Sequence, residues 1–164
     1  LVVFSMLKPI NVGAEIFHEL IESNSYYVDK TKFIKTIFEE NTSKVMLITR
    51  PRRFGKTLTM STFYDFLALD PVNPTDVSRQ EKWFKDTKIF EDKDFCSKYM
   101  GKYPVIFVSF KTIVHQNFND AYNQFSTLIY RLALQFEYLA SSKELSDKQK
   151  EQYANLVNYE KLIN

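Results

Sequence analysis

A glycine, a lysine and a threonine, Gly55-Lys56-Thr57, follow one another between an apolar run and an amphipathic run of the chain. In a phosphate-binding loop these three residue types have separate roles. The glycine lets the backbone approach the phosphates, the lysine carries charge to the β and γ positions, and the threonine hydroxyl binds Mg²⁺. The chemistry expected of this triplet is therefore the binding of a nucleoside triphosphate with magnesium.

The residues before the triplet depart from the usual spacing, in which another glycine stands five positions before Gly55. Arg50 occupies that position here. Pro51 fixes its own φ but has no N–H to offer an anion, whereas Arg52 and Arg53 add positive charge that suits a triphosphate or a nucleic acid. From spacing and context alone, the stretch is either a phosphate-binding loop, which we favour, or a solvated basic turn.

The Lys-Thr pair gains its meaning from the elements around it, because the same dipeptide also occurs at three other places in the chain. Only the copy at Lys56 follows a glycine and a continuous apolar run, residues 45–49, of the kind expected for a buried strand. After Gly55 the apolar residues between positions 58 and 67 recur at helical spacing. The sequence therefore predicts a loop between a strand and a helix, where a phosphate-binding loop must lie.

The remaining elements follow in a regular order. A second buried strand is predicted at residues 104–110, and the polar stretch at residues 70–103 is predicted to be a long surface excursion with one short helix. Further helices are predicted at residues 16–21, 33–38, about 118–140 and about 146–163. This order favours an α/β fold of the P-loop NTPase type, a parallel sheet flanked by helices.

The bulk composition narrows the classes of function. A length of 164 residues suits one domain, and a net charge of +2 gives no large field to attract nucleic acid or a membrane. The opening LVVFSM is too short for a signal peptide or a membrane span, and the single Cys96 fits a reducing compartment. We therefore expect an intracellular, cytoplasmic protein. The first residue is Leu1 and the last residues form an uncapped helical pattern, so we expect a fragment.

The string RPRRFGKTLTMS, preceded by YYVDKT and followed by YPVIFVSFK, resembles the AAA-ATPase-like family. Members often carry a C-terminal nuclease-like domain of the restriction-endonuclease type. The resemblance runs from about Ile10 to the C-terminus and makes Arg50, in place of the first glycine, an expected feature. It implies ATP and Mg²⁺ as cofactors, with Lys56 as the catalytic residue and Thr57 as the magnesium ligand. The residues implied to surround the phosphates are Arg50, Pro51, Arg52, Arg53, Phe54, Gly55, Lys56, Thr57 and Leu58.

The family resemblance also implies a second nucleotide motif, a strand ending in paired acids that polarises the magnesium and orients the attacking water. The predicted strand at residues 104–110 closes on Ser109-Phe110-Lys111 without a carboxylate. We therefore expect residues 1–164 to be a single P-loop domain truncated before that motif, and to bind nucleotide weakly and hydrolyse it poorly. The competing hypothesis is a non-catalytic module that uses Arg50, Arg52 and Arg53 to bind nucleic acid or another protein.

Other polar residues are less informative about chemistry. Asp29 and Lys30 could place a nucleotide base, but a structural role is favoured, since an aspartate beside a turn commonly satisfies local N–H groups. His18 and His115 have no cysteine or carboxylate at ligand spacing, so neither predicts a zinc site. Both are expected to lie on the surface or on a helix face.

Overall fold

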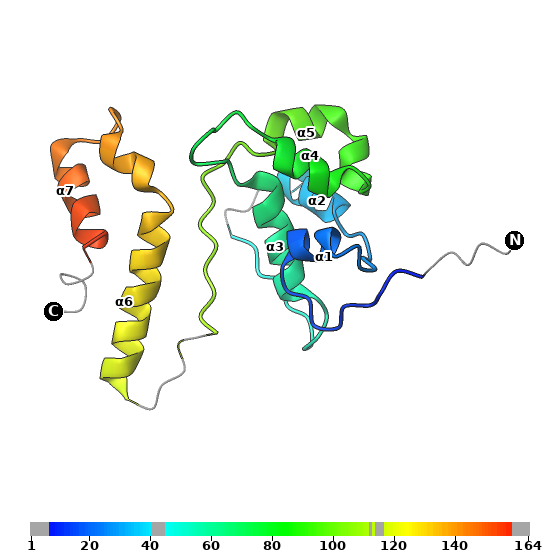
Figure 1. The fold of residues 1–164 in the computed structure, drawn as a ribbon, viewed down its shortest axis with the longest axis horizontal. Coiled ribbons are helices and arrows are strands. Elements are labelled where there is room, and N and C mark those ends of the chain that lie inside the picture. The colour runs from blue at the N-terminus through cyan, green and yellow to red at the C-terminus, as the bar shows by residue number, and fades with distance from the viewer. Residues whose placement is uncertain (1–6, 41–44, 112, 114–116, 159–164) are drawn as a thin grey trace, which may run out of the picture. The chain divides into compact units, whose positions relative to one another are not determined.

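The computed structural model describes residues 7–40, 45–111, 113 and 117–158. The chain divides into two compact units, residues 1–105 and residues 106–164. The first unit holds α1 (Phe17–Glu22), α2 (Lys32–Glu40), α3 (Lys56–Leu67), α4 (Ser78–Phe84), the 3-10 helix η1 (Lys88–Glu91) and α5 (Lys93–Tyr99) (Figure 1). The second unit holds α6 (Phe118–Leu134), the 3-10 helix η2 (Glu137–Ser141) and α7 (Asp147–Leu156).

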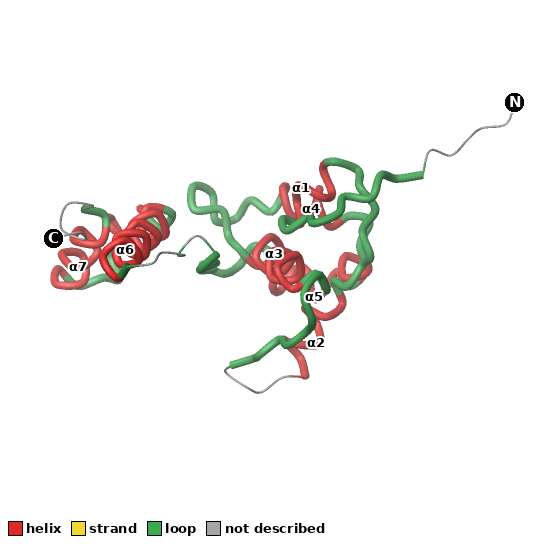
Figure 2. The backbone as a smooth tube through the Cα atoms, turned by 90° about the horizontal axis from the view of Figure 1, so that it is seen from below, coloured by secondary structure: helices red, strands yellow, loops and turns green. Residues whose placement is uncertain are grey.

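The predicted α/β fold with a parallel sheet is wrong, because the regular elements of the described residues are helices and these residues form no sheet. A single isolated parallel bridge joins Ala68 to Tyr103, and Figure 2 draws both predicted strands as loop. The prediction assumed that an apolar run is a buried strand, but Val45 and Leu47 are each 84% exposed. A strand needs neighbours that pair its backbone and cover its side chains, and the described chain pairs no neighbour with residues 45–49.

The predicted helices of the first unit are confirmed. Helices α1 and α2 form where apolar residues recur at helical spacing, and they bury Phe17, Leu20 and Ile34. Helix α3 begins directly after Gly55 and ends at Leu67, before the Asp-Pro pair that the sequence marks as a break. The helix that follows the candidate loop therefore stands where the sequence placed it.

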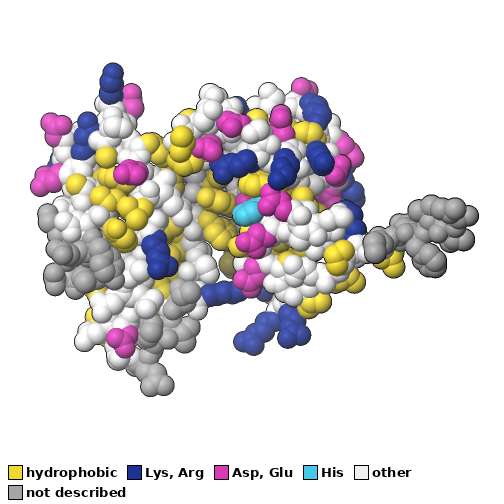
Figure 3. Space-filling view, in the orientation of Figure 1, with side chains coloured by type: hydrophobic (Ala, Val, Ile, Leu, Met, Phe, Trp, Pro, Cys, Tyr) yellow, Lys and Arg dark blue, Asp and Glu magenta, His cyan; other side chains and the backbone are white. Residues whose placement is uncertain are grey.

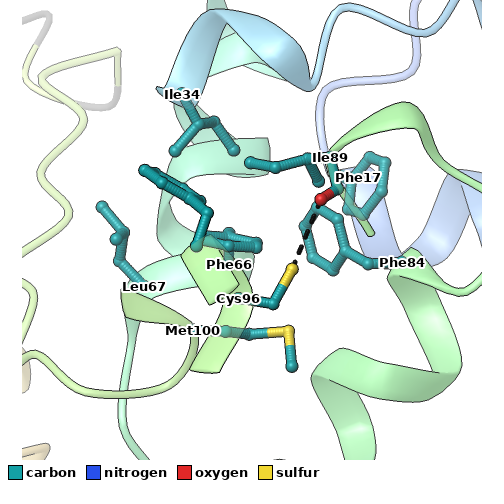
Figure 4. Packing of buried hydrophobic residues seen from close by; sticks show 9 residues of the cluster. Phe17, Ile34, Phe66, Leu67, Phe84, Ile89, Cys96 and Met100 are labelled. Atoms are coloured by element: carbon teal, nitrogen blue, oxygen red, sulfur yellow. Dashed lines mark hydrogen bonds between the residues drawn. The ribbon is translucent and has the colours of Figure 1, made fainter. Parts of the chain in front are cut away.

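The core of the first unit is a cluster of buried apolar side chains from every helix around α3 (Figure 4). The Phe66 ring lies at its centre, 5.2 Å from the Phe84 ring centroid and 6.0 Å from that of Phe95. Phe17 closes the cluster from α1, with its ring centroid 4.6 Å from that of Phe84. Such close aromatic pairs add specific geometry to the burial of large apolar area. The last turn of α3 is consequently anchored on three other helices.

The prediction that residues 70–103 form a surface excursion is wrong. This stretch contains α4, η1 and α5, and it supplies more than half of the core cluster. Its buried members are Phe84, Ile89, Phe95, Cys96 and Met100. Mean polarity misled the prediction because these short helices bury only one side each and present charged residues to solvent. Figure 3 shows lysine, arginine and acidic side chains interspersed over the face it presents of this unit.

Asp29 joins two segments that are distant in sequence, which confirms its expected structural role. Its Oδ1 accepts hydrogen bonds from the Thr31 N–H at 2.8 Å and the Thr31 hydroxyl at 2.7 Å, ahead of α2. Its Oδ2 accepts one from the Lys88 N–H at 2.7 Å, where η1 begins. The Thr31 hydroxyl in turn accepts the Ile89 N–H at 3.1 Å. One carboxylate thus satisfies the exposed amides at the starts of two helical segments.

Helix α1 is held against α3 by hydrogen bonds to its first N–H groups. The Phe17 N–H donates to the Ser61 hydroxyl at 2.9 Å, and the His18 N–H donates to Asp65 Oδ2 at 3.0 Å. The His18 ring also places Nδ1 3.0 Å from both oxygens of Asp65, and it stacks on Trp83 of α4 with ring centroids 4.9 Å apart. The first residues of α1 therefore receive their capping groups from α3 rather than from their own flank.

The second unit is a pair of helices joined by η2. Asn117 caps α6 by accepting the Asp120 N–H at 2.8 Å, and Ser146 with Gln149 forms a capping box at the start of α7. The Tyr153 hydroxyl donates to the Ala133 carbonyl at 2.8 Å and ties α7 to α6. The two predicted helices are thus confirmed over shorter ranges, since α6 ends at Leu134 and α7 ends at Leu156. Residues 159–163 of the second prediction lie outside the described residues. No helix in the described part of the chain is long and apolar enough to cross a membrane.

The central place of Phe66 generates a stability prediction. Phe66→Ala is expected to lower the free energy of unfolding of the first unit by about 3–5 kcal/mol, because the fully buried ring leaves a cavity that its neighbours cannot fill. Phe54→Ala is the matched control, since the Phe54 ring is 59% exposed, and its expected cost is below about 0.5 kcal/mol. Urea denaturation followed by circular dichroism measures both; equal losses would contradict the core described above.

The buried Asp65 carboxyl generates a prediction about pH. Burial raises the pKa of Asp65, although hydrogen bonds and charge from His18 oppose the increase. A carboxyl with a raised folded-state pKa stabilises the fold while protonated, and that contribution is lost as pH rises from about 3.9 through the raised value. We therefore expect the stability of the wild type, relative to Asp65→Asn, to decline as the pH rises from about 3.9 through the raised pKa of Asp65. Parallel urea titrations test this, and a relative gain for the wild type would contradict it.

Candidate functional site

The candidate loop, residues 50–55, joins the extended residues 45–49 to the first turn of α3 (Figure 1). Two of its residues have a left-handed backbone: Arg53 with φ 66° and Gly55 with φ 72°. Glycine adopts this conformation without a steric penalty, whereas for a residue with a Cβ it costs about 1–2 kcal/mol. Left-handed residues of this kind occur in turns that direct successive N–H groups at an anion.

Lys56 closes the loop on itself. Its Nζ donates hydrogen bonds to the Arg50 carbonyl at 2.7 Å and to the Pro51 carbonyl at 2.9 Å. These contacts join the first two residues of the loop to the first residue of the helix across five and six positions of sequence. Charge-assisted hydrogen bonds of this kind are stronger than neutral ones. The predicted site residues Arg50, Pro51 and Lys56 are thus brought together by the structure.

The N-terminus of α3 faces this loop. The first hydrogen bond of the helical ladder is donated by the Thr59 N–H to the Gly55 carbonyl at 2.8 Å. The N–H groups of Lys56, Thr57 and Leu58 therefore precede the ladder and have no acceptor inside the helix. Together with the helix dipole, they form the kind of backbone surface that binds phosphate.

The loop is strongly positive for a chain of small net charge. Residues 41–64 contain no aspartate or glutamate, while residues 50–56 carry three arginines and a lysine. The whole chain has a net charge of +2, so everything outside these seven residues sums to −2. The Arg50 guanidinium donates to the Thr49 carbonyl at 3.2 Å, and Arg52 and Arg53 are exposed. The positive charge is concentrated at the helix N-terminus, where an anion gains most from it.

The other predicted site residues differ in their surroundings. Pro51 and Phe54 are exposed, and the Phe54 ring is 59% exposed. Thr57 is half-buried at the second position of the helix, and Leu58 packs its side chain against the hydrophobic core. Leu58 can therefore offer an anion only its backbone N–H, while the hydroxyl of Thr57 belongs to the first turn of the helix.

A polar cluster that the sequence did not reveal lies further along α3. Asp65, the first carboxylate after the loop, is buried and bonds to α1 through the His18 backbone and ring. Both histidines were expected on the surface or on a helix face. His18 is half-buried and stacks on Trp83, whereas His115 lies outside the described residues. The sequence feature that could have revealed this cluster is the pair Ser61 and Asp65, which lie four residues apart on the same helix. Among the described residues, no three histidine, cysteine or acidic side chains gather as a metal site.

Comparisons with known proteins place the chain in a family. It matches the AAA-ATPase-like family, described as Predicted AAA-ATPase, over residues 11–163. The chain therefore belongs to the AAA-ATPase-like family, which confirms the resemblance of its loop and flanking motifs. It is also 27% identical over 123 residues to the "Uncharacterized protein in vnfD 5'region" of Azotobacter chroococcum mcd 1. That match covers 74% of this chain and 21% of the relative, so the chain spans about a fifth of the relative's length. No solved structure matches the chain.

The closure of the loop by Lys56 generates a prediction about dynamics. Lys56→Met keeps most of the side-chain length but removes the ammonium group that donates to Arg50 and Pro51. We expect the amides of residues 50–55 to exchange hydrogen about 5- to 30-fold faster, the effect of losing about 1–2 kcal/mol of local stability. Hydrogen exchange followed by mass spectrometry measures this. Lys102→Met alters an exposed lysine outside the loop and controls for the charge change; unchanged exchange at 50–55 in Lys56→Met would contradict the closure.

Proposed function

We propose that the chain is the nucleotide-binding part of an ATPase-like protein and that the candidate loop together with the first turn of α3, Arg50 to Leu58, binds the phosphates of ATP with Mg²⁺. The observation that carries the proposal is the Lys56 closure at the N-terminus of α3, in a segment, residues 50–58, that has four cations and no carboxylate. Membership of the AAA-ATPase-like family supports it, since the loop lies inside the matched residues.

Each part of the loop has a physical role in this proposal. The free N–H groups of the first turn of α3 and the dipole of the helix stabilise phosphate oxygens. Gly55 lets the backbone approach closely: a Cβ there would meet no atom within 4 Å, but the φ of 72° favours glycine. Lys56, held at the mouth of the loop by two carbonyls, supplies its ammonium to the β and γ phosphates. Arg50, Arg52 and Arg53 raise the positive potential around them.

Magnesium is the cofactor that neutralises the charge of the phosphates when it is bound. The donor set fits this ion in part, because Thr57 offers one hydroxyl oxygen in the first turn of α3. Magnesium keeps several of its waters and commonly takes only one or two protein ligands beside the phosphates. Thr57 is therefore the residue proposed to hold it.

Hydrolysis needs a carboxylate that the described loop does not supply. Asp65 is the nearest in sequence, but it lies nine residues after Lys56 along the helix, roughly 13 Å by the rise of 1.5 Å per residue. It is also occupied by the contacts with α1. We propose that the acid needed for turnover is contributed from outside residues 1–164, so that these residues bind nucleotide and hydrolyse it poorly.

The proposal is tested by calorimetric titration of ATP with Mg²⁺ into residues 1–164 and into the complete product of the gene. Lys56→Ala is expected to weaken binding about 10- to 100-fold, because it removes a charge-assisted contact worth about 1.5–3 kcal/mol and the closure of the loop. Lys102→Ala, at an exposed lysine outside the loop, is expected to leave the dissociation constant unchanged.

Two results would contradict the proposal. One is the absence of binding heat for both proteins; the other is an equal effect of Lys56→Ala and Lys102→Ala. The alternative function, a module that binds nucleic acid or protein through the basic loop, predicts a different pattern. Binding of a nucleic acid would then fall steeply with salt, and changes at Arg52 and Arg53 would weaken it more than Lys56→Ala does.

A further inference from the structure

We propose that Arg53 determines whether the loop distinguishes a nucleoside triphosphate from a diphosphate. This inference rests on the proposed function and concerns the same loop. It assigns the discrimination between triphosphate and diphosphate to one arginine, which acts beside Lys56; Lys56 keeps the role on the β and γ phosphates given above and also holds the loop closed.

The first observation is that two of the four cations of residues 50–56 already have partners. The Lys56 ammonium donates to the Arg50 and Pro51 carbonyls, and the Arg50 guanidinium donates to the Thr49 carbonyl. By contrast, no ion pair within 4.0 Å joins Arg52 or Arg53 to a carboxylate of the described residues. Their two guanidinium groups are exposed to solvent.

The second observation separates Arg53 from Arg52. Arg53 has a φ of 66°, a backbone conformation that it shares among the described non-glycine residues only with Asn24. Arginine is unfavourable there and glycine would be free of strain, so the side chain must have a use that offsets the backbone cost. Asparagine tolerates this conformation because its short side chain bonds locally, which arginine cannot do in the same way. Arg52 has no such constraint.

The chemistry of arginine fits a terminal phosphate. The guanidinium is planar, stays charged and can donate two parallel hydrogen bonds to two phosphate oxygens. A lysine in the same position carries the charge but not the paired donors. Arg53 is three residues before Lys56, so it and Lys56 lie on opposite sides of Gly55, the residue at which the backbone can approach the phosphates. A group that contacts only the third phosphate changes affinity for the triphosphate and leaves the diphosphate unaffected.

The experiment measures dissociation constants for ATP and ADP, each with Mg²⁺, in the complete gene product and three variants. The wild type is expected to prefer ATP, and Arg53→Gly is expected to reduce that preference at least tenfold, mainly by weakening ATP. Arg53→Lys should retain part of it. Arg52→Gly removes the same charge from the same loop and should weaken ATP and ADP by similar factors, because it lowers the general potential only.

The melting temperature separates a binding role of Arg53 from a purely structural one. Replacing a purely structural arginine would lower the melting temperature. Arg53→Gly relieves the strained backbone, so we expect a melting temperature equal to or above that of the wild type while the preference for ATP falls. Equal loss of preference in Arg53→Gly and Arg52→Gly, or an unchanged preference in Arg53→Gly, would overturn the assignment of Arg53. Failure of the wild type to bind either nucleotide would instead overturn the proposed function and this inference together.

Discussion

The two ends of helix α3 lie in opposite environments, one exposed and one buried, and the arrangement of the first unit depends on this difference. Its first turn leaves N–H groups open beside a positive loop, whereas its last turn buries Phe66 completely in the aromatic core. Ten residues of helix separate these two ends, roughly 15 Å at 1.5 Å per residue. Because the buried end is fixed by α1, α4 and α5, the exposed end can present the loop without being packed itself.

The polar contacts in the middle of α3 also fix this helix to the rest of the first unit. Ser61 and Asp65 accept the first N–H groups of α1, so that a helix of six residues without a cap of its own is stabilised by its neighbour. A short helix has little intrinsic stability in water, so it depends on such tertiary contacts. Burying a carboxylate for this purpose is costly unless it is well bonded, and Asp65 meets that condition through His18. Asp65 is consequently part of the scaffold that holds the loop.

Several features followed from the sequence because they depend on local periodicity. The helix after Gly55, the pair α1 and α2 and the two long helices of the second unit all show apolar residues at helical spacing. The loop was predicted from Gly55-Lys56-Thr57 together with the helical pattern after it and the apolar run before it; the helix is present, and the described residues 45–49 form no strand. The prediction of a parallel sheet was wrong because an apolar run such as residues 45–49 does not reveal whether another strand pairs with it.

The remaining features could not be predicted because they join residues far apart in the chain. Asp65 meets His18 across 47 positions and Asp29 meets Lys88 across 59, and neither pair has a local pattern. The buried residues of α4 and α5 were hidden by the charged residues around them, so that a surface stretch was predicted where Phe84 and Phe95 are buried. Likewise, the residue types of the loop indicate a phosphate site, but the closure by Lys56 is visible only in three dimensions.

The most direct test of the account is hydrogen exchange of the complete gene product with and without ATP and Mg²⁺. If the open first turn of α3 and its loop hold the phosphates, nucleotide should slow exchange in residues 50–58, while the buried turn around Phe66 should already be protected in its absence. Protection that appears elsewhere and spares residues 50–58, or no protection at saturating nucleotide, would contradict the claim that this loop is the phosphate site.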